Sequence, residues 1–122
     1  MAYIVIEDVK VYNDAIEIAE VIYKRVMQFP SFDRYSLGKQ LMEAADSIAA
    51  NISEGHGRYF FKENRNFCFY ARGSLLETKT WLCKARKRNL IPEDEFSKLI
   101  QDLNTLHYNL NMYINSIGPS TK

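Results

Sequence analysis

The sequence holds little cysteine and little histidine. Two cysteines are too few for a disulfide framework, and no zinc-finger pattern accompanies them, so we expect no structural zinc site. No uncharged apolar run is long enough for a helix that crosses a hydrocarbon layer about 30 Å thick. The first eight residues lack the basic region and cleavage site of a secretory signal. We therefore expect a cytoplasmic protein that binds no metal and does not enter a membrane.

Catalytic signatures are missing as well. The sequence contains no P-loop, no GxSxG elbow and no GxGxxG fingerprint. Neither His56 nor His107 belongs to a Glu-x-x-His pair, so the ligand set of the di-metal helical bundles is absent. His56 lies between two glycines and suits a turn better than a general base. We expect no catalytic residue and no cofactor, and hence a protein that is not an enzyme.

Apolar residues are plentiful, at 47% of 122 residues, which is enough for one globular domain. Four segments repeat apolar residues at spacings of three and four, the period of an amphipathic helix. They predict helices over about 9–29, 37–54, 59–88 and 92–117. Such helices bury their apolar stripes most simply against one another. We therefore expect a single all-α domain over residues 1–122, an up-and-down four-helix bundle.

Helix-breaking and capping residues separate these segments. Pro30 ends the first helix, and residues 30–35 are predicted to form a loop before Ser36, a suitable N-cap. Asn89 suits the C-terminal cap of the third helix, and Pro92 suits the first turn of the fourth. Residues 3–6 are either a short extended arm or an apolar lead-in to the first helix, and residues 1–8 receive no assigned role.

The helix predicted over residues 59–88 is apolar on two sides. Ala71 and Thr78 mark the side that faces the bundle. Phe69, Leu76 and Cys83 are spaced by seven and lie more than about 100° away around the helix. This second stripe would be adhesive on a monomer, so we expect it to form an oligomer interface with another copy of the protein. The alternative is that loops or the N-terminal arm cover it.

The two cysteines lie on this same helix. Cys68 and Cys83 are separated by 15 positions, which corresponds to roughly 22 Å along a helix, so no disulfide can join them. We expect both to be buried as small apolar residues.

The net charge of +1 hides an uneven distribution. Residues 1–57 hold five basic and nine acidic side chains, residues 58–88 hold nine and two, and residues 89–122 hold two and four. The basic segment is a candidate nucleic-acid interface, because a line of cations fits a line of phosphates. The candidate residues are Arg58, Lys62, Arg65, Arg72, Lys79, Lys84, Arg86, Lys87 and Arg88.

Four of these cations, at positions 65, 72, 79 and 86, are spaced by seven and form what we call the basic row. No RNA-binding aromatic signature, GxxG loop or zinc finger accompanies the basic row. The alternatives are a solvated face, or pairing with acidic side chains of neighbouring helices or copies, for which the candidates are Glu17, Glu20, Glu43 and Asp46.

Two linked motifs carry a family resemblance. Residues 47–58 read SIAANISEGHGR, and residues 71–78 read ARGSLLET. The pair resembles the bacterial four-helix bundle family associated with 23S ribosomal RNA intervening sequences, over nearly the whole chain. The resemblance implies an up-and-down bundle that assembles as a homopentamer. A related member is an accessory protein to the reverse transcriptase of diversity-generating retroelements. The motif residues with expected structural roles are Ser47, Asn51, Glu54, Gly55, Gly57, Gly73, Ser74 and Glu77.

Elementary physics suggests what some motif residues do. A glycine in mid-helix costs about 1 kcal/mol relative to alanine, so Gly73 is expected at a close helix approach or a kink, with Ser74 beside it. Gly55 and Gly57 would permit the chain to reverse.

These observations lead to two hypotheses about function. The first is an oligomeric adaptor that binds structured RNA or an RNA–protein complex, such as one with a reverse transcriptase, through repeated basic stripes. The second is a protein–protein interaction scaffold that binds no nucleic acid.

Overall fold

The computed structural model describes residues 4–119, which are entirely helical or irregular, with no strand. A 3-10 turn, η1 (Ile6–Asp8), precedes five α-helices. Their bounds are α1 Lys10–Val26, α2 Ser31–Tyr35, α3 Leu37–His56, α4 Phe61–Lys87 and α5 Glu93–Ser116. No described helix has the length and apolar content needed to span a membrane.

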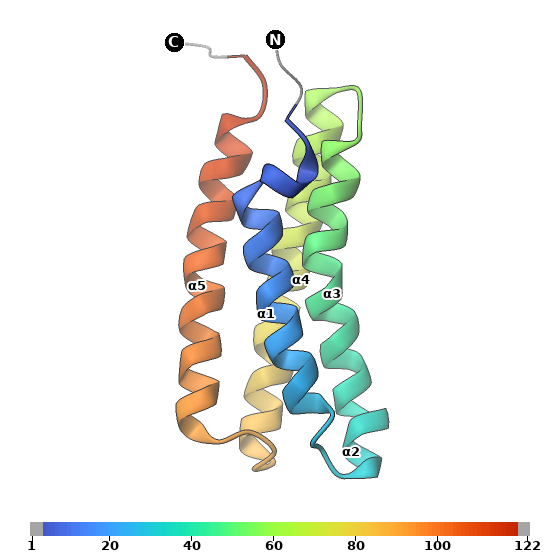
Figure 1. The fold of residues 1–122 in the computed structure, drawn as a ribbon, viewed down its shortest axis with the longest axis vertical. Coiled ribbons are helices and arrows are strands. Elements are labelled where there is room, and N and C mark those ends of the chain that lie inside the picture. Colours follow the sequence, from blue (N-terminus) through green and yellow to red (C-terminus); the bar gives the residue numbers. More distant parts are fainter. Residues whose placement is uncertain (1–3, 120–122) are drawn as a thin grey trace.

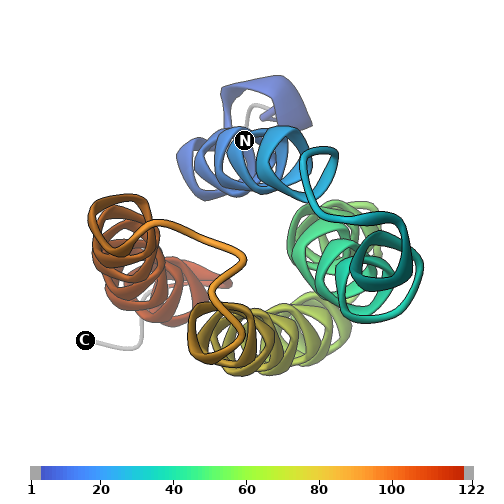
Figure 2. The same ribbon diagram turned by 90° about the horizontal axis from the view of Figure 1, so that it is seen from below.

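The four long helices lie side by side along the long axis of the molecule (Figure 1). The α3–α4 turn and both ends of the described chain lie at one end of the bundle, and α2 lies at the other. Seen along the bundle, α1, α3, α4 and α5 follow one another around a shared interior (Figure 2). The packing agrees, because α3 contacts α4 and α1, and α5 contacts α4 and α1. The all-helical fold predicted from the sequence is confirmed.

The predicted apolar stripes meet in this interior. The buried side chains come from all four long helices, as amphipathic packing requires. On α4, Cys68, Leu75 and Leu82 are buried together with Ala71 and Thr78, the residues that were predicted to face the bundle. Thr78 is the one buried polar residue in the described part of the chain, and its Oγ1 donates to the Ser74 carbonyl at 2.8 Å. Its hydroxyl is therefore satisfied within its own helix.

The end of α4 is fixed as predicted by Asn89, which adopts a left-handed φ of 59°. The Leu90 amide donates to the Ala85 carbonyl at 2.9 Å, and the Asn89 amide donates to the Arg86 carbonyl at 3.0 Å. This is the Schellman pattern, which satisfies the last carbonyls of a helix. It turns the chain so that Ile91 is buried before α5 begins.

Residues 30–35 differ from the predicted loop, because Ser31–Tyr35 form α2. A helix of five residues is too short to show a helical period in the sequence. Ser36 does not cap α3 with its side chain. Its Oγ donates instead to the Phe32 carbonyl at 2.7 Å, within the last turn of α2. At the other end of the chain, Ile4 and Val5 are not helical, and Tyr3 lies outside the described residues.

The glycines of the family motif have different structural roles from those predicted. A Cβ on Gly73 would meet nothing within 4 Å, so the expectation of a close approach is wrong within the subunit. The close approach is at Gly55, where a Cβ would lie 2.8 Å from the Asn64 carbonyl oxygen and 2.8 Å from Phe67 Cβ. Gly57 has an ordinary φ of −80°, so the reversal after α3 does not depend on a left-handed glycine there.

Candidate nucleic-acid interface

The basic row runs along the seam between α4 and α5. In its middle, Arg72 Nη1 donates to Asn111 Oδ1 at 2.8 Å, and Lys79 Nζ donates to Asn104 Oδ1 at 2.7 Å. Asn104 and Asn111 are themselves seven residues apart, so the two antiparallel helices keep the same register across both contacts. Both cations are half-buried. The middle of the basic row is thus fixed against α5 by amide oxygens.

The two ends of the basic row bond to backbone carbonyls. Arg65 Nη1 donates to the Ile117 carbonyl at 3.0 Å, just beyond the end of α5. Arg86 Nη1 donates to the Ile91 carbonyl at 2.9 Å, just before α5 begins. Because the last carbonyls of a helix carry partial negative charge, the Arg65 contact also stabilises the C-terminal end of α5. All four cations therefore join α4 to α5 or to its flanks.

Three of the four cations of the basic row have only neutral partners, so their charge is not cancelled. In the described part of the chain, no ion pair joins Arg65, Arg72 or Lys79 to a carboxylate. Only Arg86 has one within reach, Glu93, at 4.0 Å. The four carboxylates proposed as partners, Glu17, Glu20, Glu43 and Asp46, form no ion pair with the basic row among residues 4–119. A neutral hydrogen-bond partner orients a cation while leaving its field in place.

The other basic residues of the segment are exposed and gather at the two ends of α4. Arg58 and Lys62 lie at the end that carries the α3–α4 turn, and Lys84, Lys87 and Arg88 lie at the opposite end. Since α4 has 27 residues, these groups are separated by about 40 Å. The candidate residues thus form one long surface, with exposed charges at its ends and half-buried, hydrogen-bonded charges along its middle.

The surface of α5 beside the basic row is uncharged. Residues 103–119 contain no Asp, Glu, Lys or Arg, although a quarter of the whole chain is charged. Asn104, Asn109, Asn111 and Asn115 lie in this stretch. Amide side chains can bond to bases and sugars, and the absence of carboxylates removes repulsion of phosphate. These residues were not among the predicted site residues, although the seven-residue spacing of Asn104 and Asn111 matches that of the basic row.

The residues of the first family motif bond along their own helix. Ser47 Oγ donates to the Glu43 carbonyl at 2.7 Å, and Asn51 Nδ2 donates to the Ser47 carbonyl at 2.8 Å. Arg58 and Glu54 form an ion pair at 4.0 Å across the end of α3. Of these contacts, only the Arg58–Glu54 pair lies at the α3–α4 end of the bundle.

The predicted oligomer stripe is exposed. Phe69, Leu76 and Cys83 all lie on the surface of α4, and no described loop or N-terminal residue covers them. The expectation that Cys83 is buried is therefore wrong within the subunit. Gly73 falls on the same face of the helix, between Phe69 and Leu76, with open space above it. Glu77 of the motif is exposed as well.

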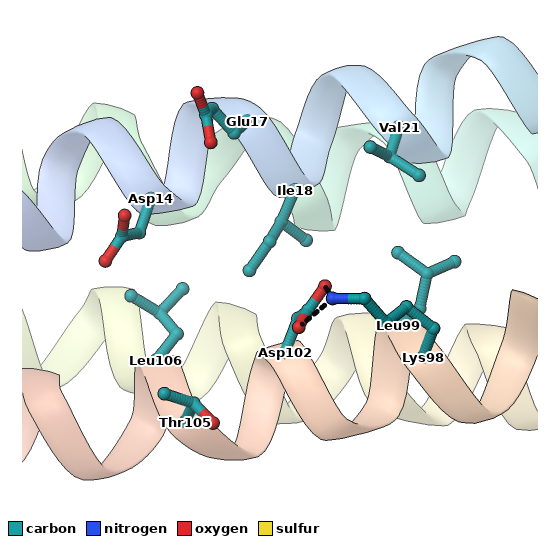
Figure 3. A pocket seen from close by; sticks show the side chains of 9 residues that line it. All are labelled: Asp14, Glu17, Ile18, Val21, Lys98, Leu99, Asp102, Thr105 and Leu106. Atoms are coloured by element: carbon teal, nitrogen blue, oxygen red, sulfur yellow. Dashed lines mark hydrogen bonds and ion pairs between the residues drawn. The ribbon is translucent and has the colours of Figure 1, made fainter.

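A cavity of about 340 Å³ lies between α1 and α5, on the acidic side of the molecule (Figure 3). Asp14 and Asp102 line it, but each already accepts a bond from a lysine, Lys10 at 2.6 Å and Lys98 at 2.7 Å. Within residues 4–119, no group of three or more His, Cys, Asp or Glu side chains is placed to hold a metal ion. Among the described residues, the cavity therefore offers no ligand set for a metal ion.

Comparisons with known proteins agree with this architecture. A family model described as 23S rRNA-intervening sequence protein matches residues 7–112. A crystal structure of a protein of unknown function from the S23 ribosomal protein family of Bacteroides thetaiotaomicron superposes with a TM-score of 0.77. It is 22% identical, and the match covers 87% of this chain and 99% of that one, which shows a shared fold. No curated protein matches the sequence.

Proposed function

Because the chain belongs to the 23S rRNA-intervening sequence protein family, we propose that it is a non-enzymatic cytoplasmic adaptor that binds structured RNA or an RNA–protein complex. The surface that binds is the α4 face with its basic row. The observation that carries this proposal is that Arg65, Arg72 and Lys79 of the basic row bond only to neutral partners. Cations that are held in line without a carboxylate can still attract a line of phosphates.

The proposal includes assembly into a homopentamer, the state that the family resemblance implies. The exposed stripe on α4 supports self-association, because a contiguous apolar surface is costly on a monomer. Gly73 supports it too. A solvent-exposed glycine in mid-helix weakens the helix by about 1 kcal/mol, and a second helix approaching closely at this point would give it a purpose. A ring would repeat the basic surface, so weak contacts would add up to strong binding.

One quadruple variant tests the RNA surface. Replacing Arg65, Arg72, Lys79 and Arg86 with Gln removes four charges while Gln can still donate a hydrogen bond. We expect binding of a fluorescently labelled RNA hairpin to be lost, because counterion release is lost with the charges. The helical circular dichroism should be retained. Binding by the unchanged protein should fall steeply as salt is raised.

A matched control separates local from overall charge. Replacing Lys10, Lys24, Lys39 and Lys98 with Gln removes the same charge from α1, α3 and α5, where these lysines are exposed. This variant should keep most of its RNA binding. Equal binding by the basic-row variant and the unchanged protein would exclude the basic row as the RNA surface.

The second candidate function is a protein scaffold without nucleic-acid binding, and the exposed stripe on α4 is the observation in its favour. A scaffold predicts self-association, or capture of a protein such as a reverse transcriptase, with no RNA binding at physiological salt. The same salt titration therefore distinguishes the two functions.

A further inference from the structure

Three consecutive aromatic side chains stand out of the turn between α3 and α4. Tyr59 is 89% exposed, Phe60 is 62% exposed and Phe61 is 47% exposed. They lie at the end of the bundle where the described chain both begins and ends (Figure 1). We call these three residues the aromatic turn. None of these three side chains is buried in the core, so packing within the bundle does not explain why they are aromatic.

Contacts with neighbouring residues hold the aromatic turn in place. The rings of Tyr59 and Phe60 meet edge to face, with centroids 4.9 Å apart. Phe61 begins α4 and packs against Gly118, where a Cβ would lie 3.5 Å from the ring. The Arg65 bond to the Ile117 carbonyl fixes this same stretch of chain. The rings are therefore presented by an anchored part of the fold.

Cations flank the aromatic turn on both sides in the sequence. Arg58 precedes it, with its guanidinium 4.7 Å from the centroid of the Phe67 ring, and Lys62 follows it. Two carboxylates lie in the same region, Glu54, which pairs with Arg58, and Glu63. Beyond Lys62, the positive surface continues along α4 to Arg65. Charge thus favours a partner that is negative along its length and that reaches the aromatic turn from the basic row.

Exposed rings beside cations are the means by which proteins hold unpaired nucleotides. Every base offers a flat face that stacks on an aromatic ring, and the phosphates between bases need cations nearby. Bases within a duplex are already stacked, so they cannot use such rings. We infer that the aromatic turn is a stacking site for unpaired bases of RNA, with Arg58 and Lys62 contacting the adjoining phosphates. The inference rests on the proposed RNA-binding function and adds the class of RNA to it.

The test compares two labelled RNAs of equal length, an unstructured oligouridine and a duplex. In the variant Tyr59→Ser/Phe60→Ser, we expect affinity for oligouridine to fall by at least about tenfold, since each stacked base contributes a few-fold to a hundredfold. Affinity for the duplex should change little. The variant Tyr59→Phe/Phe60→Tyr keeps both rings, so it should retain binding of oligouridine.

The chain offers a matched control at its other end. Phe32 and Tyr35 of α2 are also strongly exposed, at 81% and 72%, and they lie far from the aromatic turn (Figure 1). Phe32→Ser/Tyr35→Ser should leave both RNA affinities unchanged. An equal loss in this control, or no loss in Tyr59→Ser/Phe60→Ser, would overturn the inference.

Other occupants of the aromatic turn give different results. If Tyr59→Ser/Phe60→Ser abolishes binding to anionic phospholipid vesicles, or reduces the oligomer size, and leaves oligouridine affinity intact, the occupant is a membrane or a second copy and the inference is wrong. If the unchanged protein binds the duplex but not oligouridine, the inference fails and the proposed function survives. If it binds neither RNA, both fail.

Discussion

Cys68 illustrates how position controls chemistry at the scale of one residue. Its side chain is fully buried in the core on α4, and this burial raises the pKa of the thiol to about 11. The raised pKa of Tyr113 has the same first cause, burial, and Cys68 adds to it. A thiol that keeps its proton is a poor nucleophile, so Cys68 serves the fold as a small apolar side chain.

Alkylation should therefore distinguish the two cysteines. In iodoacetamide at pH 8, we expect Cys83 to be modified and Cys68 to be protected, because one is exposed and the other is buried as the thiol. Peptide mass spectrometry measures both sites, and unfolding in guanidinium should make them react alike. Modification of Cys68 as fast as Cys83 in the native protein would contradict its burial.

The Cys68 thiol also makes stability depend on pH. Its pKa is about 11 in the folded protein against 9.0 for an unperturbed thiol, so the unfolded chain releases this proton first. The contribution of the thiol is fully present below pH 9 and is lost as pH rises towards 11. We expect the midpoint of urea unfolding to fall over this range, and to fall less in Cys68→Ala measured against its own value at pH 8.

Gly55 and Gly73 give a pair of opposite expectations. Gly55→Ala would place a Cβ 2.8 Å from the Asn64 backbone, so we expect a loss of about 2 kcal/mol or more. Gly73→Ala meets only open space, so the isolated subunit should gain about 0.5–1 kcal/mol from helix propensity. Urea unfolding of dilute protein measures both. A loss of stability in Gly73→Ala would contradict the open space found beside Gly73.

The sequence could not assign these two glycines correctly. Both cost helix stability, and that cost alone does not say whether a second helix lies nearby. Which of them is crowded depends on the depth at which α3 and α4 meet, and this is a property of the assembled bundle.

At the scale of elements, the sequence predicted most of the fold because its helical periods are long. The apolar period over residues 92–117 predicted one long amphipathic helix, and Leu99, Leu103, Leu106 and Leu110 of α5 are buried in the core. The basic row was predicted from the spacing of seven between its four cations. Whether it would be open or covered could not be predicted, because this depends on which side of α4 meets α5.

The pair Arg25–Glu95 connects two elements that are distant in sequence. Arg25 in the last turn of α1 donates Nε to both carboxylate oxygens of Glu95 at 3.1 and 3.0 Å, and Nη2 also bonds to the carboxylate. Glu95 lies in the first turn of α5, and its hydrogen bond raises the pKa of Arg25. The pair therefore joins the end of α1 to the beginning of α5. Each charge also has the sign that the helix dipole favours at its end, a cation at the C-terminus and a carboxylate at the N-terminus.

We expect Glu95→Gln to cost about 1 kcal/mol of unfolding free energy, since the pair is two-pronged and partly buried. The control is Asp102→Asn, which breaks the exposed pair Lys98–Asp102 within one helix and should cost less than about 0.5 kcal/mol. Urea unfolding measures both. Equal costs would mean that the α1–α5 connection adds nothing beyond an ordinary surface pair.

At the scale of the whole molecule, charge and apolar surface are both concentrated on α4. The α1 and α3 part of the chain is acidic, α4 is basic, and the surface of α5 beside the basic row is neutral. The exposed stripe and the basic row run side by side on α4, and the Arg72 guanidinium lies 5.0 Å from the centroid of the Phe69 ring. A second subunit on the stripe would therefore lie directly beside the basic row, so each substitution is tested for both assembly and RNA binding.

Leu76→Glu tests the assembly. The charge would be buried in a subunit interface, at a cost of several kcal/mol, so we expect sedimentation to show smaller species than the unchanged protein forms. Val21→Glu is the control, because Val21 is an exposed apolar residue of similar accessibility on α1. Its oligomer size should not change, and a monomeric unchanged protein at tens of micromolar would exclude the interface.

The alkylation rate of Cys83 tests the same interface, because Cys83 belongs to the exposed stripe. As the unchanged protein is concentrated, assembly should cover the stripe and slow the alkylation of Cys83, which is exposed in the isolated subunit. In Leu76→Glu the alkylation rate should stay fast at every concentration, because the subunits no longer meet. Concentration-independent alkylation of the unchanged protein, together with a large sedimenting species, would place the interface on another face. In that case, the basic surfaces of neighbouring subunits would be arranged around that other interface.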